Sequence, residues 1–188
     1  MTAMTSELVA TPTRGRPGAV QSTPTSPTDP RLGAWRTLIH AHARLIRRMD
    51  EELQATHAIS LAEYDALLQL ANAPGRRLRM SVLAERVLLS RSGITRLVDR
   101  LVADGMVERS ACPTDARGAM AALRPAGLDR LRAASLTHLD GVARYFLDVV
   151  TPEDRAAIER GLGAVVEELE AGGPGGIADS VCTTTGEA

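Results

Sequence analysis

Aromatic residues are scarce in this chain of 188 residues, at 2% of the total. The hydrophobic core must therefore be built mainly from Leu, Val, Ala and Ile. The chain has two cysteines, Cys112 and Cys182, too few for a disulfide framework. It has no run of about 18 apolar residues, and its N-terminus lacks the apolar segment of a signal peptide. These absences predict a cytoplasmic protein without a membrane span, long enough for one domain with a real core.

Lysine is also absent, so all 22 positive charges are arginines, and the formal net charge is −1. That balance argues by itself against nucleic-acid binding. The distribution of charge changes this interpretation. Residues 76–117 hold nine arginines against five acids, a net charge of +4, whereas residues 141–188 hold three against nine, a net charge of −6. Because phosphate meets a local basic patch rather than the global charge, DNA remains a candidate partner for the middle of the chain.

The two ends of the chain differ in composition from its middle. Residues 1–30 are rich in Thr, Pro, Ser and Gly without periodicity, and residues 171–188 begin with Ala-Gly-Gly-Pro-Gly-Gly. Such segments bury too little apolar surface to fold, so both are predicted to be disordered tails. One folded domain over residues 31–170 remains.

The first half of this domain predicts two helices. Apolar residues at helical spacing indicate a long helix over residues 31–56. Ser60 and Glu63 have the spacing of a capping box and begin the second helix, which Pro74 ends. The stripe of the first helix consists of Trp35, Leu38, Ile39, His42, Leu45, Ile46, Met49 and Leu53.

Residues 78–117 carry the most informative pattern. A short apolar stripe, a tight connector at Leu88-Leu89 and a second stripe predict two helices joined by a turn, as in a helix-turn-helix. Ser90 is the expected N-cap of the second of these helices, and Gly105 is its expected left-handed stop. The two stripes are Val82, Leu83, Ala84 and Val87, and then Ile94, Leu97, Val98, Leu101 and Val102.

The opposite face of this second helix offers short hydroxyls and guanidinium groups near its N-terminus, where an ordinary surface helix mixes Glu and Lys. Such groups reach phosphates and base edges, and a helix N-terminus itself attracts phosphate. This face predicts a DNA-reading helix. Its members are Arg91, Ser92, Thr95, Arg96, Asp99 and Arg100.

A two-stranded hairpin is predicted after Gly105, with strands over residues 106–109 and 119–123 and a loop over residues 110–118. The second strand is rich in alanine and has poor strand propensity. Asp115 and Arg117 lie in the loop. An arginine there can enter a narrow minor groove. The alternative is a solvated Arg117 paired with Asp115.

Two more helices complete the domain. Pro125 suits the first turn of one, and Thr151 and the residues after it begin the other. Their stripes, together with that of the first helix, bury best against each other and a second copy, which predicts a two-fold dimer. A dimer would present two reading helices to two half-sites. The stripes are Leu128, Leu131, Leu139, Val142 and Phe146, and then Ile158, Leu162, Val165, Val166 and Leu169.

The fold class predicted is mainly α with a small β-hairpin wing, that is, a winged helix-turn-helix with a helical dimerisation region. The chain resembles the MarR (multiple antibiotic resistance regulator) family. The resemblance rests on LAEYDALLQLANAP, LRMSVLAERVLLSRSGITRLVDRLVADGMVERSACPTDARGA and LRPAGLDRL, and covers residues 31–170. It implies a homodimeric transcription regulator, commonly a repressor, that binds an inverted repeat in double-stranded DNA and responds to a small ligand or oxidant.

The resemblance also assigns roles to residues. The wing-tip acid and arginine of the family match Asp115 and Arg117, while Ala116 stands where the family commonly has arginine. Arg124 stands where the family commonly has threonine ahead of Pro125, so that helix lacks a capping hydroxyl. The positions expected in the major groove are Ser90, Arg91, Ser92, Thr95 and Arg96.

A small aromatic or anionic effector is the second expected partner. The resemblance implies a cleft between the dimerisation helices and the winged lobe, with Trp35, Arg44, Tyr64 and Asp65 as its candidate residues. A buried Asp65 must be paired or protonated. The alternatives are a structural pair of Asp65 with Arg44 or Arg48, and a Trp35 that only fills the core.

No metal site, cofactor or enzyme is predicted. His40 and His42 point to different faces of one helix, and no Cys or acid cluster joins them or His138. Cys112 is either a redox sensor or a passive wing residue. No catalytic constellation has credible spacing. The alternative function is a winged-helix protein-interaction module without DNA readout, which the arginines of residues 91–100 disfavour.

Overall fold

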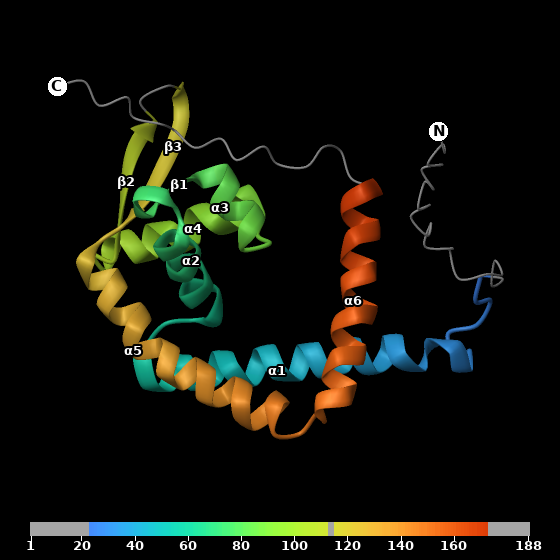
Figure 1. Cartoon of the computed structure of the whole chain (residues 1–188). Helices are drawn as coiled ribbons and strands as arrows, with labels where there is room; N and C mark the ends of the chain where they lie inside the picture. Colours follow the sequence, from blue (N-terminus) through green and yellow to red (C-terminus); the bar gives the residue numbers. More distant parts are fainter. Residues whose placement is uncertain (1–22, 113–114, 173–188) are drawn as a thin grey trace, which may run out of the picture. The chain divides into compact units, whose positions relative to one another are not determined.

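The computed structural model describes residues 23–112 and 115–172, without the side chains of residues 112–117 and 172. The chain divides between His40 and Ala41 into two units. Figure 1 labels most of the elements along the chain. In order they are η1 (Pro30–Leu32), α1 (Gly33–His57), α2 (Leu61–Asn72), η2 (Pro74–Arg76), β1 (Arg77–Arg79), α3 (Met80–Arg86), α4 (Arg91–Ala103), β2 (Val107–Cys112), β3 (Asp115–Leu123), α5 (Pro125–Val142), η3 (Ala143–Leu147) and α6 (Pro152–Gly172).

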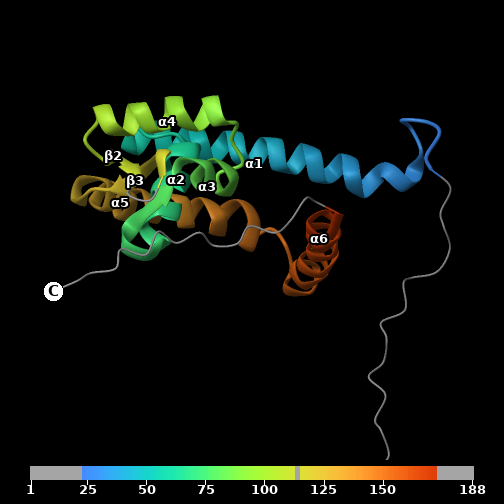
Figure 2. The same cartoon turned by 90° about the horizontal axis from the view of Figure 1, so that it is seen from above.

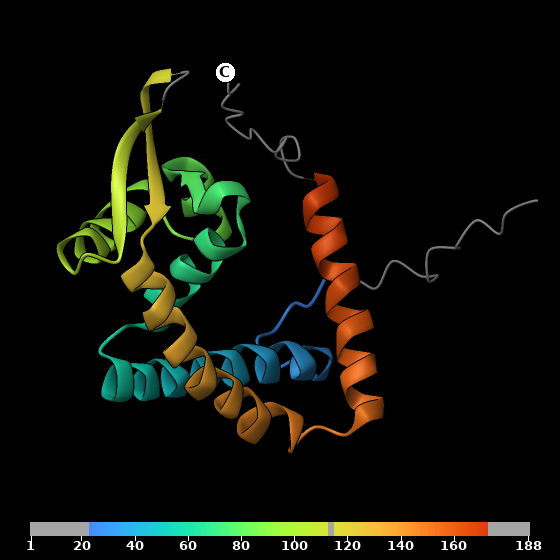
Figure 3. The same cartoon turned by 60° about the vertical axis from the view of Figure 1, so that its left-hand side comes forward.

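The predicted fold class is confirmed: the chain is mainly helical with a small antiparallel sheet. The sheet has the strand order β1-β3-β2, so β3 is its central strand. Figure 3 shows β2 and β3 as a long ribbon that rises from the helices. Elements α2, α3, α4 and the three strands are called the winged lobe below. This arrangement is that of a winged helix-turn-helix.

The wing differs from the sequence prediction in two ways. The strands continue through most of the predicted loop at residues 110–118, because β2 and β3 pair from Val107↔Leu123 to Ala111↔Ala119 and, after a register shift, at Cys112↔Asp115. The strand β1 was not predicted, since three residues are too few to show alternation. Leu78 of β1 is buried opposite Ala121, which is fully buried. Pairing on both edges of β3 therefore outweighs the poor strand propensity of its alanines.

The core lies in the second unit, among α2, α3, α4, the sheet and the start of α5. The predicted stripe of the reading helix is confirmed in its main part, because Ile94, Leu97, Val98 and Leu101 are buried. Val102, at the end of that stripe, is exposed instead. The largest fully buried side chains are Leu53, Ile59, Leu67, Leu70, Leu83, Ile94, Val98, Leu101 and Val107.

The terminal helices bury only part of their predicted stripes in this core, to which α1 contributes Leu53 and α5 contributes Leu131. Leu139 of α5, predicted to point inward, is 61% exposed. None of the described side chains of α6 is buried, and Leu169 is 70% exposed. In the first unit Trp35 is 59% exposed, so its alternative role as a core residue is wrong for the single chain. A π-helical turn, η3, extends α5 and was not predicted.

Candidate nucleic-acid interface

The N-terminus of α4 is built as the sequence predicts. Ser90 has an extended backbone, and its hydroxyl accepts a hydrogen bond from the Gly93 N–H at 3.1 Å. Gly105 ends the helix region with a φ of 70°, a conformation that favours glycine. The buried stripe of α4 holds the helix against α2 and α3, so the opposite face is directed to solvent. Figure 2 shows α4 along one side of the winged lobe.

The predicted DNA-facing side chains of α4 are exposed together. Within the described residues, Arg91 and Arg96 have no acidic partner, so their guanidinium groups are available to an anion. The Thr95 hydroxyl donates to the Arg91 carbonyl oxygen at 2.9 Å. The hydroxyls of Ser90 and Ser92 lie 3.2 Å apart. These three hydroxyls retain lone pairs that can accept hydrogen bonds from a ligand.

A surface hollow of about 370 Å³ joins the start of α4 to the wing. Three arginines from three elements line it: Arg79 from β1, Arg91 from α4 and Arg109 from β2. Arg109 is also held at 2.5 Å by Asp99 on the exposed face of α4. Guanidinium groups around a helix N-terminus form an anion-attracting surface. The hollow therefore suits a phosphate backbone that passes between α4 and the wing.

The wing-tip residues are placed by their backbone alone. Asp115 and Arg117 belong to β3 near its paired end with Cys112. Their side chains lie outside the description, as does that of Cys112, so the predicted minor-groove contact and the redox alternative stay predictions.

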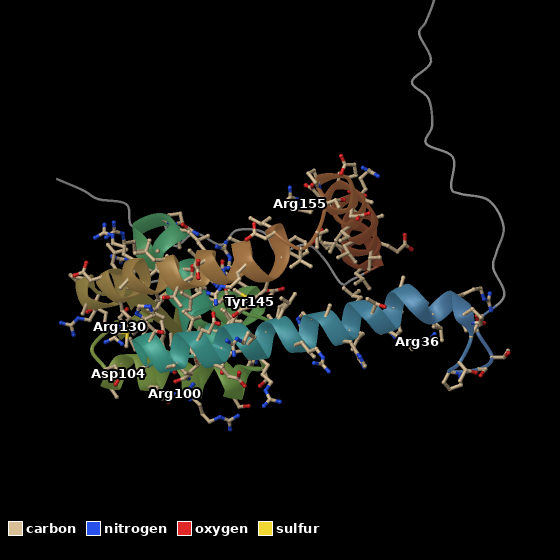
Figure 4. The ribbon with its side chains drawn as sticks, turned by 90° about the horizontal axis from the view of Figure 1, so that it is seen from below. Arg36, Arg100, Asp104, Arg130, Tyr145 and Arg155 are labelled. Atoms are coloured by element: carbon tan, nitrogen blue, oxygen red, sulfur yellow. The ribbon has the colours of Figure 1, made fainter. Side chains whose placement is uncertain are left out.

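Arg100 has a partner that the sequence did not predict. The sequence places it on the DNA-facing side of α4, but its Nε donates to Glu63 Oε1 of α2 at 2.8 Å. Figure 4 labels Arg100 on α4. The partner lies 37 positions away in the sequence, so helical periodicity carried no signal for it. Unlike Arg91 and Arg96, Arg100 has an acidic partner in the described part of the chain, but its side chain is 59% exposed, so its predicted DNA contact stays a prediction.

The predicted effector residues are only partly brought together. Tyr64 is buried and stacks on His138 with ring centroids 4.5 Å apart. Asp65 is half-buried and accepts from Gln69 Nε2 at 3.2 Å. Its alternative ion pair with Arg48 is wrong, because Arg48 donates to Glu52 and to the Tyr145 hydroxyl.

Two other effector candidates lie on α1. Arg44 is exposed beside Arg47 and Arg48 and has no acidic partner in the described part of the chain. In the described part of the chain, Asp65 forms no ion pair with Arg44. Trp35 belongs to the other unit.

Sequence reasoning missed a second polar cluster, around Tyr145 of η3. The Arg144 and Arg48 guanidinium groups lie 4.9 and 5.8 Å from its ring centroid, and its hydroxyl donates to Glu52. Figure 4 labels Tyr145 close to α1. Nothing in the local sequence pairs η3 with α1, since Tyr145 and Glu52 are 93 positions apart. Among the described residues, no three His, Cys, Asp or Glu side chains gather as a metal site.

The fold and this exposed helix define the class of winged helix-turn-helix proteins. Comparisons with known proteins narrow the class. Residues 59–118 match the model of the MarR family. Sco3205 of Streptomyces coelicolor, a MarR family transcriptional regulator solved in complex with DNA, is 33% identical over 80% of this chain and 94% of its own, with a TM-score of 0.73. The chain belongs to the MarR family of transcriptional regulators.

Two further solved structures agree in fold. AbsC of Streptomyces coelicolor, also a MarR family transcriptional regulator, is 30% identical over 77% of this chain and 97% of its own, with a TM-score of 0.70. The transcriptional regulator BldR of Sulfolobus solfataricus is 23% identical over 77% of this chain and 99% of its own, at a TM-score of 0.65, and shows the fold alone. No match was found among curated proteins. In the stretches that the structure describes, no helix combines the length and the apolar character that crossing a bilayer requires.

Proposed function

We propose that this chain is a homodimeric transcriptional repressor that binds an inverted-repeat operator in double-stranded DNA. The observation that carries the proposal is a pair of exposed arginines, Arg91 and Arg96. They lie on the N-terminal turns of α4, whose opposite face is buried in the core. Without an acidic partner in the described residues, each is free to bind a guanine edge or a phosphate. The DNA complex of the similar Sco3205 supports this role.

The dimer is part of the proposal because the terminal helices expose apolar side chains. Leu38 and Ile39 of the first unit are exposed, as are Leu139 and the stripe of α6 in the second. Monomeric proteins rarely leave large contiguous apolar patches in water. A second copy would cover such helices and would present two α4 helices to half-sites about one helical turn apart.

Response to an effector is the third part. Tyr64, Asp65 and the exposed Arg44 offer an aromatic ring, a carboxylate and a cation, which suits a small aromatic or anionic molecule. Trp35 of the other unit remains a candidate. An effector would release DNA only by binding one arrangement of the two α4 helices better than another. A regulator of this kind works where the DNA is, in the cytoplasm, and has no enzymatic step.

The experiment is a selection of bound sites from random duplex DNA, followed by affinity measurements on the recovered site. Arg91→Ala and Arg96→Ala should each weaken specific binding about 10-fold or more, since a bidentate arginine–guanine contact is worth about 1–3 kcal/mol. Arg47→Ala is the matched control, because Arg47 is highly exposed on α1 and pairs with Glu51. Wild-type affinity in both α4 variants would show that this helix does not read the operator.

A further inference from the structure

The recognition helix α4 is tied to the N-terminus of α2 by a buried carboxylate. Glu63 is 8% exposed and uses both of its oxygens. Oε1 accepts from Arg100 Nε at 2.8 Å, and Oε2 accepts from the Ser60 backbone N–H at 2.8 Å. The Ser60 hydroxyl in turn accepts from the Glu63 N–H at 3.2 Å. One side chain therefore completes the cap of α2 and holds the last turn of α4.

The connection continues to α1 within the second unit. Asp50 Oδ1 accepts from the Leu61 backbone N–H at 2.8 Å, one residue after the cap of α2. The path from Arg100 through Glu63 and the α2 N-terminus to Asp50 thus links the reading helix to one of the proposed dimerisation helices. The hydrogen bonds from Arg100 to Glu63 and from the Leu61 N–H to Asp50 each involve an ionisable side chain. Hydrogen bonds to charged groups are stronger than those between neutral groups.

Glu63 is charged at neutral pH. Burial alone would raise the pKa of Glu63, but the hydrogen bonds from Ser60 and Arg100 outweigh that effect and hold it below its usual value. A charged carboxylate inside the protein that loses its cation is strongly unfavourable. The position of Arg100, and so of the helix that carries it, is consequently restrained much more than that of an ordinary surface arginine.

We propose that the Glu63–Arg100 pair positions α4 for DNA, and that Arg100 acts through Arg91 and Arg96 without touching a base or a phosphate. The inference rests on the proposed function. Arg100 follows Arg96 by about one helical turn on the same rigid helix. Bidentate contacts require the reading groups to be held within about 0.5 Å and 10–20°. A change in the tilt of α4 about its buried stripe moves its N-terminal arginines out of that range.

Three single variants, and the double variant that combines Glu63→Gln with Arg100→Ala, test the role. Glu63→Gln keeps an oxygen that can accept from the Ser60 N–H and nearly the same volume, but removes the charge. Arg100→Ala removes the other partner, and Arg100→Lys retains a cation. Glu51→Gln is the matched control, because Glu51 is a half-exposed carboxylate paired with Arg47 on α1. Each full-length variant is measured for affinity to the selected operator, salt slope of that affinity and free energy of unfolding.

The positioning role predicts a specific pattern. Glu63→Gln and Arg100→Ala should each weaken operator binding about 2- to 30-fold, the range seen for residues that act without touching the ligand. The double variant should lose no more than the worse single variant, because both break one link. Affinity for unrelated duplex DNA and the salt slope should stay at the wild-type values, and Arg100→Lys should recover part of the loss.

Three results would overturn it. A salt slope reduced by about one unit in Arg100→Ala, with Glu63→Gln binding normally, would make Arg100 a phosphate contact. Lower stability in both variants with wild-type operator affinity would leave the pair a purely structural role. A wild type that selects no DNA site would overturn the proposed function itself, and the positioning role with it.

Discussion

At the scale of single residues, Leu88 stands out in the turn between α3 and α4. Its φ is +56° and its side chain is 91% exposed, so it bears left-handed strain without gaining burial. Such strain costs a non-glycine residue about 1–2 kcal/mol. Leu88→Gly should remove it and, after the entropy that glycine loses on folding, stabilise the protein by about 0.5–1 kcal/mol. Urea unfolding measures this change.

The control for that variant is Ala103→Gly at the end of α4, in the ordinary helical region, which should be destabilising. Reduced stability in Leu88→Gly would contradict the strain argument.

His138 predicts a dependence of stability on pH. Burial lowers its pKa, which the nearby Asp65 opposes, and within the described residues its buried Nδ1 has no hydrogen-bond partner. The folded state therefore binds this proton less readily than the unfolded state does. Stability is unaffected above the unfolded pKa of about 6.5, and it falls as the pH drops from there through the lower folded pKa.

The free energy of unfolding measured between about pH 7.5 and 5 tests this sign. His138→Gln should flatten the slope in that window, while the exposed His42→Gln should keep the wild-type slope. A slope equally steep in His138→Gln would assign the proton uptake to another group.

Residues whose role is local could be predicted from the sequence, and residues whose role is tertiary could not. The capping box of Ser60 and Glu63, the N-cap Ser90 and the stop at Gly105 all depend on neighbours within a few positions, and all are confirmed. The pairing of Arg100 with Glu63 depends on how α4 packs on α2. Helical periodicity gives the face of a residue, and it does not give the distance to an acid on another helix.

At the scale of elements, the start of α5 is fitted closely to Met106, the residue just before the strand β2. A Cβ built on Gly127 would lie 2.3 Å from the Met106 backbone oxygen, which cannot move as a side chain does. Gly127→Ala should therefore destabilise the protein by about 1–3 kcal/mol, although alanine is the better helix former. Thermal or urea unfolding measures the sign of this change in stability.

Gly141, in the same helix, supplies the matched control. A Cβ there would meet its nearest atom, Glu52 Oε2, at 3.6 Å, which is ordinary contact. Gly141→Ala should thus be neutral or stabilising by up to about 1 kcal/mol. If Gly127→Ala and Gly141→Ala both stabilise the protein, helix propensity alone determines the change in stability, and α5 can shift away from Met106.

The elements themselves were predictable where their periodicity is long. The helices α1, α2, α4, α5 and α6 begin close to the predicted positions because each has a repeated stripe or a start signal. The lengths of β2 and β3 and the presence of β1 depend on pairing between strands, which composition does not report. The turn-forming residues at 110–118 predicted a long loop, and backbone pairing converted most of it to strand.

At the scale of the whole molecule, net charge and local charge give opposite expectations for how salt changes the affinity for DNA. The formal net charge is −1, but the exposed arginines gather on α4 and near the wing. If they meet phosphates, log K for the operator should fall linearly with log salt, with a slope of about −0.9 for each phosphate neutralised. Binding isotherms at several salt concentrations measure it. A flat response would favour the protein-interaction alternative.

The last prediction concerns assembly. Val166 lies on the exposed apolar face of α6 with Leu162 and Leu169, and a second copy is the proposed cover for that face. Val166→Asp places a charge there, which is costly to bury without a partner, so the variant should be monomeric or aggregated and should bind the operator much more weakly. Ala164→Asp adds the same charge on the other side of α6 and should remain dimeric. Light scattering on size-separated protein measures the mass, and a monomeric wild type at micromolar concentration would contradict the dimer.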